Sequence, residues 1–217
     1  YIYTGSSIIG FALPGTLQVI CDYTTWLTAP DKTKYYPLLT QQEYLDAELD
    51  AEQMHFLAID AHELMDGVAG KITTYKKAIL VVSSSNAHAM PSVRRFLTEL
   101  MYHNITCPVI LQVAGSDDTV DEQLIHYATD AGALLLDGFG DGIWLISNAA
   151  AMQNSKVSGR TYLEVKSNEQ FLNNTAFSIL QDTRTRISKT EYISCPSCGR
   201  TLFDLQETTA KIRAATN

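Results

Sequence analysis

Apolar residues in this chain form short continuous runs that alternate with stretches of helical periodicity. Five runs rich in Val, Ile, Leu or Ala, each bounded by turn residues, predict strands over Gln18–Tyr23, His55–Ala61, Ala78–Ser83, Pro108–Val113 and Ala133–Gly138. Runs that are apolar at nearly every position suit strands buried on both faces. This strand-then-helix alternation predicts an α/β fold in which helices cover a parallel sheet.

The segments between these runs predict helices. Pro91–His103 has a proline in its first turn, and both it and Thr119–Asp130 carry an apolar stripe at helical spacing. Thr40–Met54 begins with acidic and amide side chains, which suit the positive end of a helix dipole. Towards the C-terminus, Asn168–Arg184 and Leu205–Ala215 are also expected to be helical.

The pattern becomes more polar and irregular in the last third of the chain. Thr161–Lys166 predicts a short strand, and a further strand is expected over Thr190–Ser194, directly before a pair of cysteines. We therefore expect one α/β domain over residues 1–188 and the beginning of a second, smaller unit over residues 189–217.

The composition is that of a globular protein, with 217 residues of which 46% are hydrophobic and 18% charged. A formal net charge of -8 argues against nucleic acid or an anionic membrane as a partner of the whole surface. The apolar runs are far too short to span a bilayer. Four cysteines in so long a chain do not suggest a disulfide scaffold, so a reducing compartment such as the cytoplasm is expected.

The most informative motif is the cysteine pair Cys195 and Cys198, which are separated by Pro-Ser and followed by glycine. Two thiols at this spacing can bind one soft metal centre, but zinc ions and iron-sulfur clusters usually take four protein ligands. The remaining cysteines, Cys21 and Cys107, are lone residues far away in the sequence. The motif is therefore half a metal site, as compatible with zinc as with iron.

Two other features follow predicted strands. The glycine-rich turn Asp137–Gly142 could hold a phosphate, but its two aspartates repel phosphate and it lacks the P-loop lysine, so a structural turn is favoured. His88 follows a run of serines, and because no nucleophile elbow is present, a solvated loop is favoured there. The spacings of the other histidines define no metal site; these are His55, His62, His103 and His126.

Basic residues gather just before the cysteine pair, which is unusual in an acidic chain. Arg184 and Arg186 are two residues apart, and Lys189 follows them. In an extended chain both arginines point to the same face, where they can bind a phosphate bidentately. The alternative is a helix C-terminus, whose dipole favours cations. Both interpretations remain open from the residues alone.

The residues around the cysteines carry a more specific resemblance. The segment from Thr190 to Leu205, TEYISCPSCGRTLFDL, resembles the cluster-binding segment of the 4-hydroxy-3-methylbut-2-enyl diphosphate synthases, iron-sulfur enzymes of the non-mevalonate isoprenoid pathway. Asp130–Gly142 and Phe177–Arg186 are similar to the long form of this family, found in plants and some bacteria. That form inserts an extra α/β domain between its catalytic TIM barrel and its cluster domain.

This resemblance implies a TIM-barrel-like or partial-barrel parallel sheet with surrounding helices over residues 1–188, followed by the beginning of a small α+β iron-sulfur domain. The family reductively converts 2-C-methyl-D-erythritol 2,4-cyclodiphosphate to 4-hydroxy-3-methylbut-2-enyl diphosphate. The electrons come from ferredoxin or flavodoxin through a 4Fe-4S cluster. The implied location is the cytoplasm, or the plastid in a plant.

The resemblance also implies roles for individual residues. Cys195 and Cys198 match the first two of three cluster cysteines, while the third cysteine and a glutamate ligand belong to a later motif that these 217 residues do not contain. Arg186 matches an arginine nine residues before the first cluster cysteine, a candidate contact to the substrate diphosphate. Trp144 stands where the family's catalytic barrel has an arginine, so the α/β domain is expected to lack a substrate site.

The preferred hypothesis is a fragment of such a synthase, inactive alone: a spacer and docking domain for the catalytic barrel of the same polypeptide, with two cluster cysteines. One alternative is a zinc-binding interaction module, in which Cys195 and Cys198 of two chains share one zinc ion. Another is an independent α/β enzyme that binds a phosphate through the Gly138 turn and His88.

Overall fold

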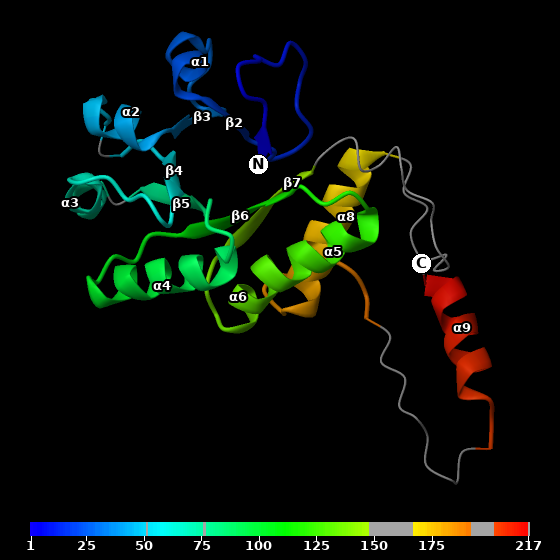
Figure 1. Ribbon diagram of the computed structural model, residues 1–217. Helices are drawn as coiled ribbons and strands as arrows, with labels where there is room; N and C mark the ends of the chain where they lie inside the picture. Colours follow the sequence, from blue (N-terminus) through cyan, green and yellow to red (C-terminus); the bar gives the residue numbers. More distant parts are fainter. Residues whose placement is uncertain (51, 76, 148–166, 192–201, 217) are drawn as a thin grey trace.

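The computed structural model describes residues 1–50, 52–75, 77–147, 167–191 and 202–216. Seven parallel strands in these ranges form one sheet in sequence order, which curls into a partial barrel (Figure 1). The strands are β1 (Ile2–Tyr3), β2 (Val19–Asp22), β3 (Tyr35–Leu39), β4 (His55–Asp60), β5 (Ala78–Ser83), β6 (Val109–Gly115) and β7 (Gly142–Ser147). The predicted α/β class and the barrel-like parallel sheet are confirmed.

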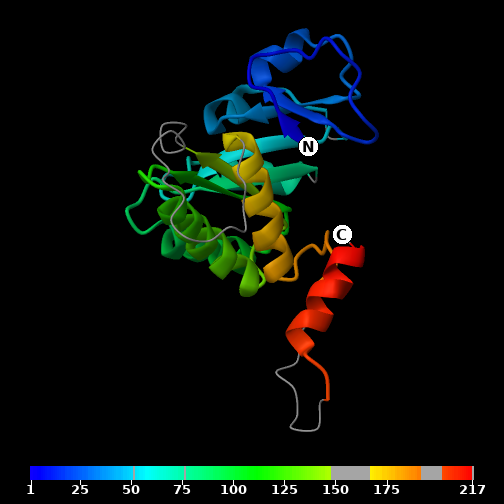
Figure 2. The same ribbon diagram turned by 90° about the vertical axis from the view of Figure 1, so that its right-hand side faces the viewer.

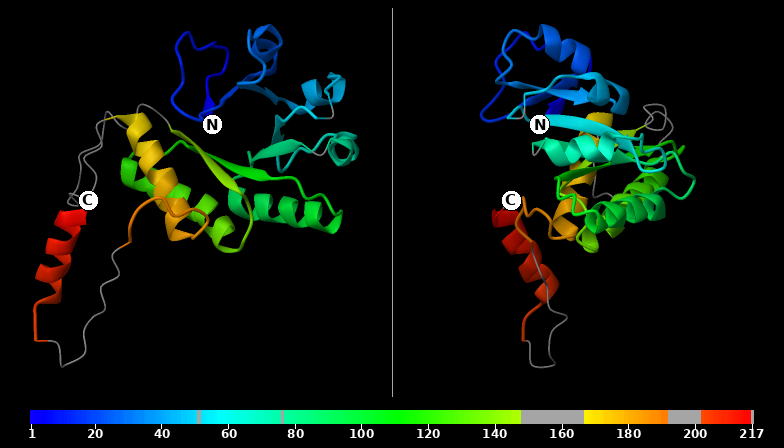
Figure 3. Two further views of the ribbon diagram at one scale, coloured as in Figure 1. Left: turned by 180° about the vertical axis from the view of Figure 1, so that it is seen from behind. Right: turned by 90° about the vertical axis from the view of Figure 1, so that its left-hand side faces the viewer.

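From β2 onward, helices connect successive strands and surround the curled sheet (Figure 2). The connecting helices are α1 (Tyr23–Thr28), α2 (Gln41–Asp46), α3 (Val68–Thr74), α4 (Ala89–Tyr102), α5 (Val120–Tyr127) and α6 (Ala133–Leu136). After β7 come α8 (Asn168–Asp182), which packs against β7, and α9 (Leu205–Thr216). Figure 3 shows α9 away from the sheet and its covering helices. Among the described residues, no helix is long and apolar enough to cross a membrane.

Strand side chains point alternately to the inner and the outer face of the sheet, where they contribute to an inner cluster, a main outer cluster and a small outer cluster of Val19, Cys21, Ala29 and Tyr35. The main outer cluster joins strand residues such as Leu57 to the buried residues of α3, α4, α5, α6 and α8. The inner cluster consists of Ile20, Phe56 and Val81 with further strand residues and Met54 packed against them, and no helical residue belongs to it. Helices therefore cover one face only, as in a barrel rather than in a doubly wound sheet.

Aromatic side chains fill the inner face. Tyr3 of β1 and Trp144 of β7 have ring centroids 4.8 Å apart, so the first and last strands meet across the interior. Phe56 is fully buried, and its ring lies 5.4 Å from that of Tyr1 and 6.5 Å from that of Tyr36. The interior of the partial barrel is thus a packed core rather than an open channel.

The prediction of a strand over Ala133–Gly138 is wrong. Ala133–Leu136 is helix α6, and the seventh strand is Gly142–Ser147. Ala and Leu have high helix propensity and no β-branched residue interrupts them, so the apolar run continues α5 through a π-helix at Ala128–Gly132. A short apolar run does not distinguish a buried strand from a buried helix by periodicity alone.

The predicted helix Thr40–Met54 begins where expected but ends early, at Asp46. The ammonium of Lys71 on α3 donates to the carbonyl oxygens of Tyr44, Leu45 and Ala47 at 2.5, 3.0 and 2.8 Å. A cation at a helix C-terminus satisfies carbonyl groups that have no intrahelical partner. The end of α2 is therefore capped by a side chain of another helix.

Most other predicted elements are confirmed with small shifts, as β2, β4, β5, β6, α4, α5, α8 and α9. The short elements β1, β3, α1 and α3 were not predicted, because each has seven residues or fewer and little periodicity. The predicted strand Thr161–Lys166, and most of that over Thr190–Ser194, lie outside the described residues.

His55, at the start of β4, is a buried histidine. Its ring lies between those of Tyr44 and Tyr75, at centroid distances of 5.4 and 6.1 Å, and Nδ1 is 2.9 Å from the carbonyl oxygen of Gln53. Among the described residues, Nε2 has no hydrogen-bond partner. Burial lowers the pKa of His55, the charge of Lys71 lowers it further, and the contact with Gln53 opposes this.

We expect the free energy of unfolding to fall as the pH drops below about 6.5, the ordinary pKa of an unfolded histidine. The unfolded chain then binds a proton that folded His55 does not, at a cost of up to about 1.4 kcal/mol per pH unit. Urea unfolding at pH 7.5 and 5.5 measures this difference. His55→Phe should reduce it, whereas a matched change at exposed His103, His103→Gln, should not. Equal pH dependence in both variants contradicts the assignment.

Candidate functional site

Polar side chains gather at the carboxyl edge of the sheet, where β/α barrels place their ligand sites. Asp60, at the end of β4, accepts hydrogen bonds from the backbone N–H of His62 at 2.9 Å and of Ser85 at 3.0 Å. Burial raises the pKa of Asp60, but these hydrogen bonds outweigh it and hold the pKa below its ordinary value. An ionised Asp60 therefore ties the loops after β4 and β5 together.

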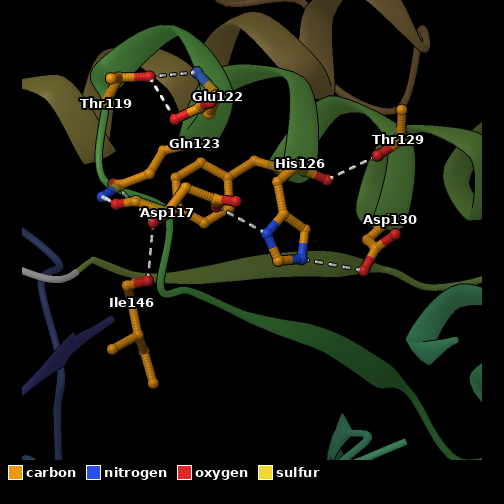
Figure 4. Close-up of polar contacts among 9 residues, drawn as sticks. Asp117, Thr119, Glu122, Gln123, His126, Thr129, Asp130 and Ile146 are labelled. Atoms are coloured by element: carbon orange, nitrogen blue, oxygen red, sulfur yellow. Dashed lines mark hydrogen bonds and ion pairs between the residues drawn. The ribbon is translucent and has the colours of Figure 1, made fainter. Parts of the chain in front are cut away.

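His126 of α5 forms the second polar group at this edge (Figure 4). Its Nδ1 lies 2.9 Å from a carboxylate oxygen of Asp117, in the loop after β6, and its Nε2 lies 3.3 Å from one of Asp130, in the π-helix. The Asp117–His126 contact joins the loop after β6 to α5. Because its ring nitrogens face the carboxylates of Asp117 and Asp130, His126 links the loop after β6 to α5 and the π-helix.

A cavity of about 220 Å³ opens beside Asp130, between the ends of β5 and β6 and the helices α4 and α5. Its apolar lining includes Val82, Leu111 and Leu134, and its polar lining includes Ser83, Ser84, Asn86, His126 and Asp130. Sites for drug-sized molecules usually exceed about 300 Å³. The carboxylate of Asp130 also disfavours a diphosphate, so this cavity suits water or a small neutral polar molecule.

The glycine-rich turn Asp137–Gly142 lies at the opposite edge, because it precedes β7 rather than following a strand. The backbone N–H of Asp141 donates to the carbonyl oxygen of Val109 at 2.7 Å, and the N–H of Val109 donates to the Asp141 carboxylate at 2.8 Å. Gly140 has φ +89°, and a Cβ there would lie 2.9 Å from Leu111. The turn is structural: it joins the starts of β6 and β7.

His88 is exposed in the loop after β5, at the edge opposite to the Gly138 turn. The two features therefore cannot form one phosphate site, and the alternative that combined them is wrong.

Among the described residues, no group of three or more His, Cys, Asp or Glu side chains could hold a metal ion. Burial raises the pKa of Cys21 to about 11, with a further contribution from Asp22, and burial also raises that of Cys107. Neither thiol favours the thiolate that binds metal.

Arg184 and Arg186, before the cysteine pair, do not form the phosphate site on one face of an extended chain that the sequence allowed. Arg184 adopts φ +62° directly after α8, and its guanidinium pairs with the carboxylate of Glu191. The guanidinium of Arg186 lies 5.4 Å from the ring centroid of Phe177. Arg186 is exposed, so it stays available as the predicted diphosphate contact, whereas Cys195 and Cys198 lie outside the described residues.

Comparison with known proteins finds the resemblance over the whole chain. Over 217 residues the chain is 30% identical to the 4-hydroxy-3-methylbut-2-en-1-yl diphosphate synthase (flavodoxin) of Phocaeicola vulgatus and 33% identical to that of Parabacteroides distasonis. The chain corresponds to one segment of these synthases. It spans about a third of the length of these relatives, covering 32% of each.

A plant synthase matches part of the same segment. Over 134 residues, which are 61% of this chain and 15% of the relative, the chain is 42% identical to the 4-hydroxy-3-methylbut-2-en-1-yl diphosphate synthase (ferredoxin), chloroplastic, of Arabidopsis thaliana. No family model matches the chain. The expected relationship to the plant and bacterial synthases is confirmed.

Proposed function

We propose that this chain is the inserted α/β domain and the beginning of the cluster domain of a 4-hydroxy-3-methylbut-2-enyl diphosphate synthase. The whole-length match to bacterial synthases carries this proposal. The complete enzyme would reduce the cyclic diphosphate of methylerythritol, and these 217 residues would be inactive alone.

Residues 1–188 would act as a spacer and docking domain for the catalytic barrel of the same polypeptide. Two observations support this role over catalysis. Trp144 packs into the inner cluster beside Tyr3, at the position where the resemblance implies an arginine in the catalytic barrels. The cavity beside Asp130 at the carboxyl edge is small and lined by a carboxylate.

Cys195 and Cys198 would supply two of the three thiolates of a 4Fe-4S cluster, and Arg186 would contact the substrate diphosphate. When bound, the cluster supplies the electrons for the reductive ring opening. The electron donor of the cluster would be flavodoxin or ferredoxin, which appear in the names of the bacterial and plant relatives. The protein would act in the cytoplasm, or in a plastid if its source is a plant.

A cluster-reconstitution experiment tests this proposal. A synthase that contains this chain and the downstream cluster motif should take up one 4Fe-4S cluster, seen in iron and sulfide analysis and in charge-transfer absorption. The 217-residue chain should hold none stably, because two thiolates are half the usual ligand set. Cys195→Ser should abolish uptake in the longer protein, with Cys21→Ser as the matched control that leaves it unchanged.

Two results contradict the proposal. One is a stable stoichiometric cluster in the 217 residues alone. The other is about half a zinc ion per chain together with dimerisation that a chelator reverses, which instead supports a zinc site shared between two chains.

A further inference from the structure

The chain is held firmly where it leaves the α/β domain. Gln181, in the last turn of α8, is only 8% exposed. Its side-chain oxygen accepts from the backbone N–H of Ser188 at 3.2 Å and of Lys189 at 2.9 Å, and its amide nitrogen donates to the carbonyl oxygen of Lys189 at 3.0 Å. One buried amide thus satisfies both backbone groups of Lys189, as a neighbouring strand would.

A second contact holds the same segment. Arg184 is in the left-handed region, at φ +62°, and its backbone N–H donates to the carbonyl oxygen of Gln181 at 3.0 Å. Glycine usually occupies this position after a helix, because a Cβ costs conformational free energy there. Here the guanidinium of Arg184 pairs with Glu191. A strained residue whose side chain bridges seven positions along the chain points to a role for that side chain.

We infer that Gln181 and Arg184 are positioning residues that fix where the chain leaves the α/β domain towards the cluster cysteines. Together with Ser188, Lys189 and Glu191 they form what we call the exit clamp. The inference rests on the proposed function, because it concerns the movement of a cluster domain relative to this one.

Chain geometry shows what the exit clamp contributes. Cys195 is four residues after Glu191, and a chain of four residues reaches at most about 14 Å, at up to about 3.6 Å per residue. With the clamp open, the last fixed residue is Arg186, whose backbone N–H donates to the carbonyl oxygen of Leu180 at 3.0 Å, and nine residues allow a reach of about 32 Å. The exit clamp therefore confines the first cluster ligand to a volume many times smaller.

Hydrogen exchange of the 217-residue chain tests the exit clamp directly. Gln181→Ala should speed exchange of the Lys189 backbone N–H about tenfold, whereas Gln181→Glu keeps the acceptor and should change it much less. Arg184→Gly should speed exchange in residues 184–191 a few-fold while leaving the thermal midpoint unchanged or higher, because glycine relieves the strain. Unchanged exchange in both Gln181→Ala and Arg184→Gly overturns the inference.

Turnover of a full-length synthase that carries the same variants tests whether confining the first cluster cysteine matters for catalysis. Arg184→Gly should lower kcat with KM and cluster content unchanged, and reversing the pair with Arg184→Glu and Glu191→Arg should restore kcat. A purely structural role predicts no loss in Arg184→Gly, and normal kcat in a variant whose exchange is faster overturns the inference. If the unmodified full-length protein has no activity, the proposed function fails instead, and hydrogen exchange still decides on the exit clamp.

Discussion

Replacing Phe56 with alanine is expected to lower the free energy of unfolding by about 4 kcal/mol. Phe56 is fully buried on the inner face, in one cluster with Ile20 and Val81 and against the rings of Tyr1 and Tyr36. Its removal leaves a cavity where the first strands meet the centre of the sheet, and neighbours fixed in strands, such as Tyr36 of β3, cannot collapse fully into it.

Urea unfolding followed by circular dichroism measures this loss. Phe11→Ala serves as the matched control, because Phe11 is 73% exposed and its change should stay within about 0.5 kcal/mol. A Phe56→Ala loss as small as that of the control contradicts a packed inner face.

Gly115→Ala is expected to cost about 3 kcal/mol of unfolding free energy. Gly115 ends β6, and a Cβ there would lie 2.5 Å from the hydroxyl oxygen of Tyr127 and 2.9 Å from its Cζ. Tyr127 cannot easily move away, because it is fully buried and its hydroxyl donates to the carbonyl oxygen of Ile146 at 2.7 Å. The change therefore either overpacks the outer core or breaks the contact between α5 and β7.

Gly70→Ala is the matched control for the same measurement. Gly70 lies inside α3, and no atom lies within 4 Å of a Cβ at that position. Alanine there should raise the free energy of unfolding by about 0.5–1 kcal/mol, because it reduces the entropy of the unfolded chain. A similar effect of both substitutions contradicts the close approach of Tyr127 to β6.

The candidate site shows which contacts were within reach of sequence reasoning. Cys195 and Cys198 stand out because their chemistry depends on spacing along the chain. The His126 group could not be found in this way, since the approach of Asp117 depends on how the loop after β6 folds back onto α5, and no periodicity encodes it. The same holds for Gln181, whose partners Ser188 and Lys189 meet it only because the chain turns at Arg184.

The sequence by itself determined the α/β class, the positions of β2, β4, β5 and β6 and the relationship to the synthases, because apolar periodicity and a short cysteine motif are local properties. Only the tertiary structure decided that Ala133–Leu136 is helical and that the Asp137–Gly142 turn therefore lies at the edge of the sheet opposite to His88. The physical reason is that the edge of the sheet at which a loop lies depends on the type and direction of the elements before and after that loop. One helix in place of a predicted strand reverses that direction and removes the candidate phosphate site.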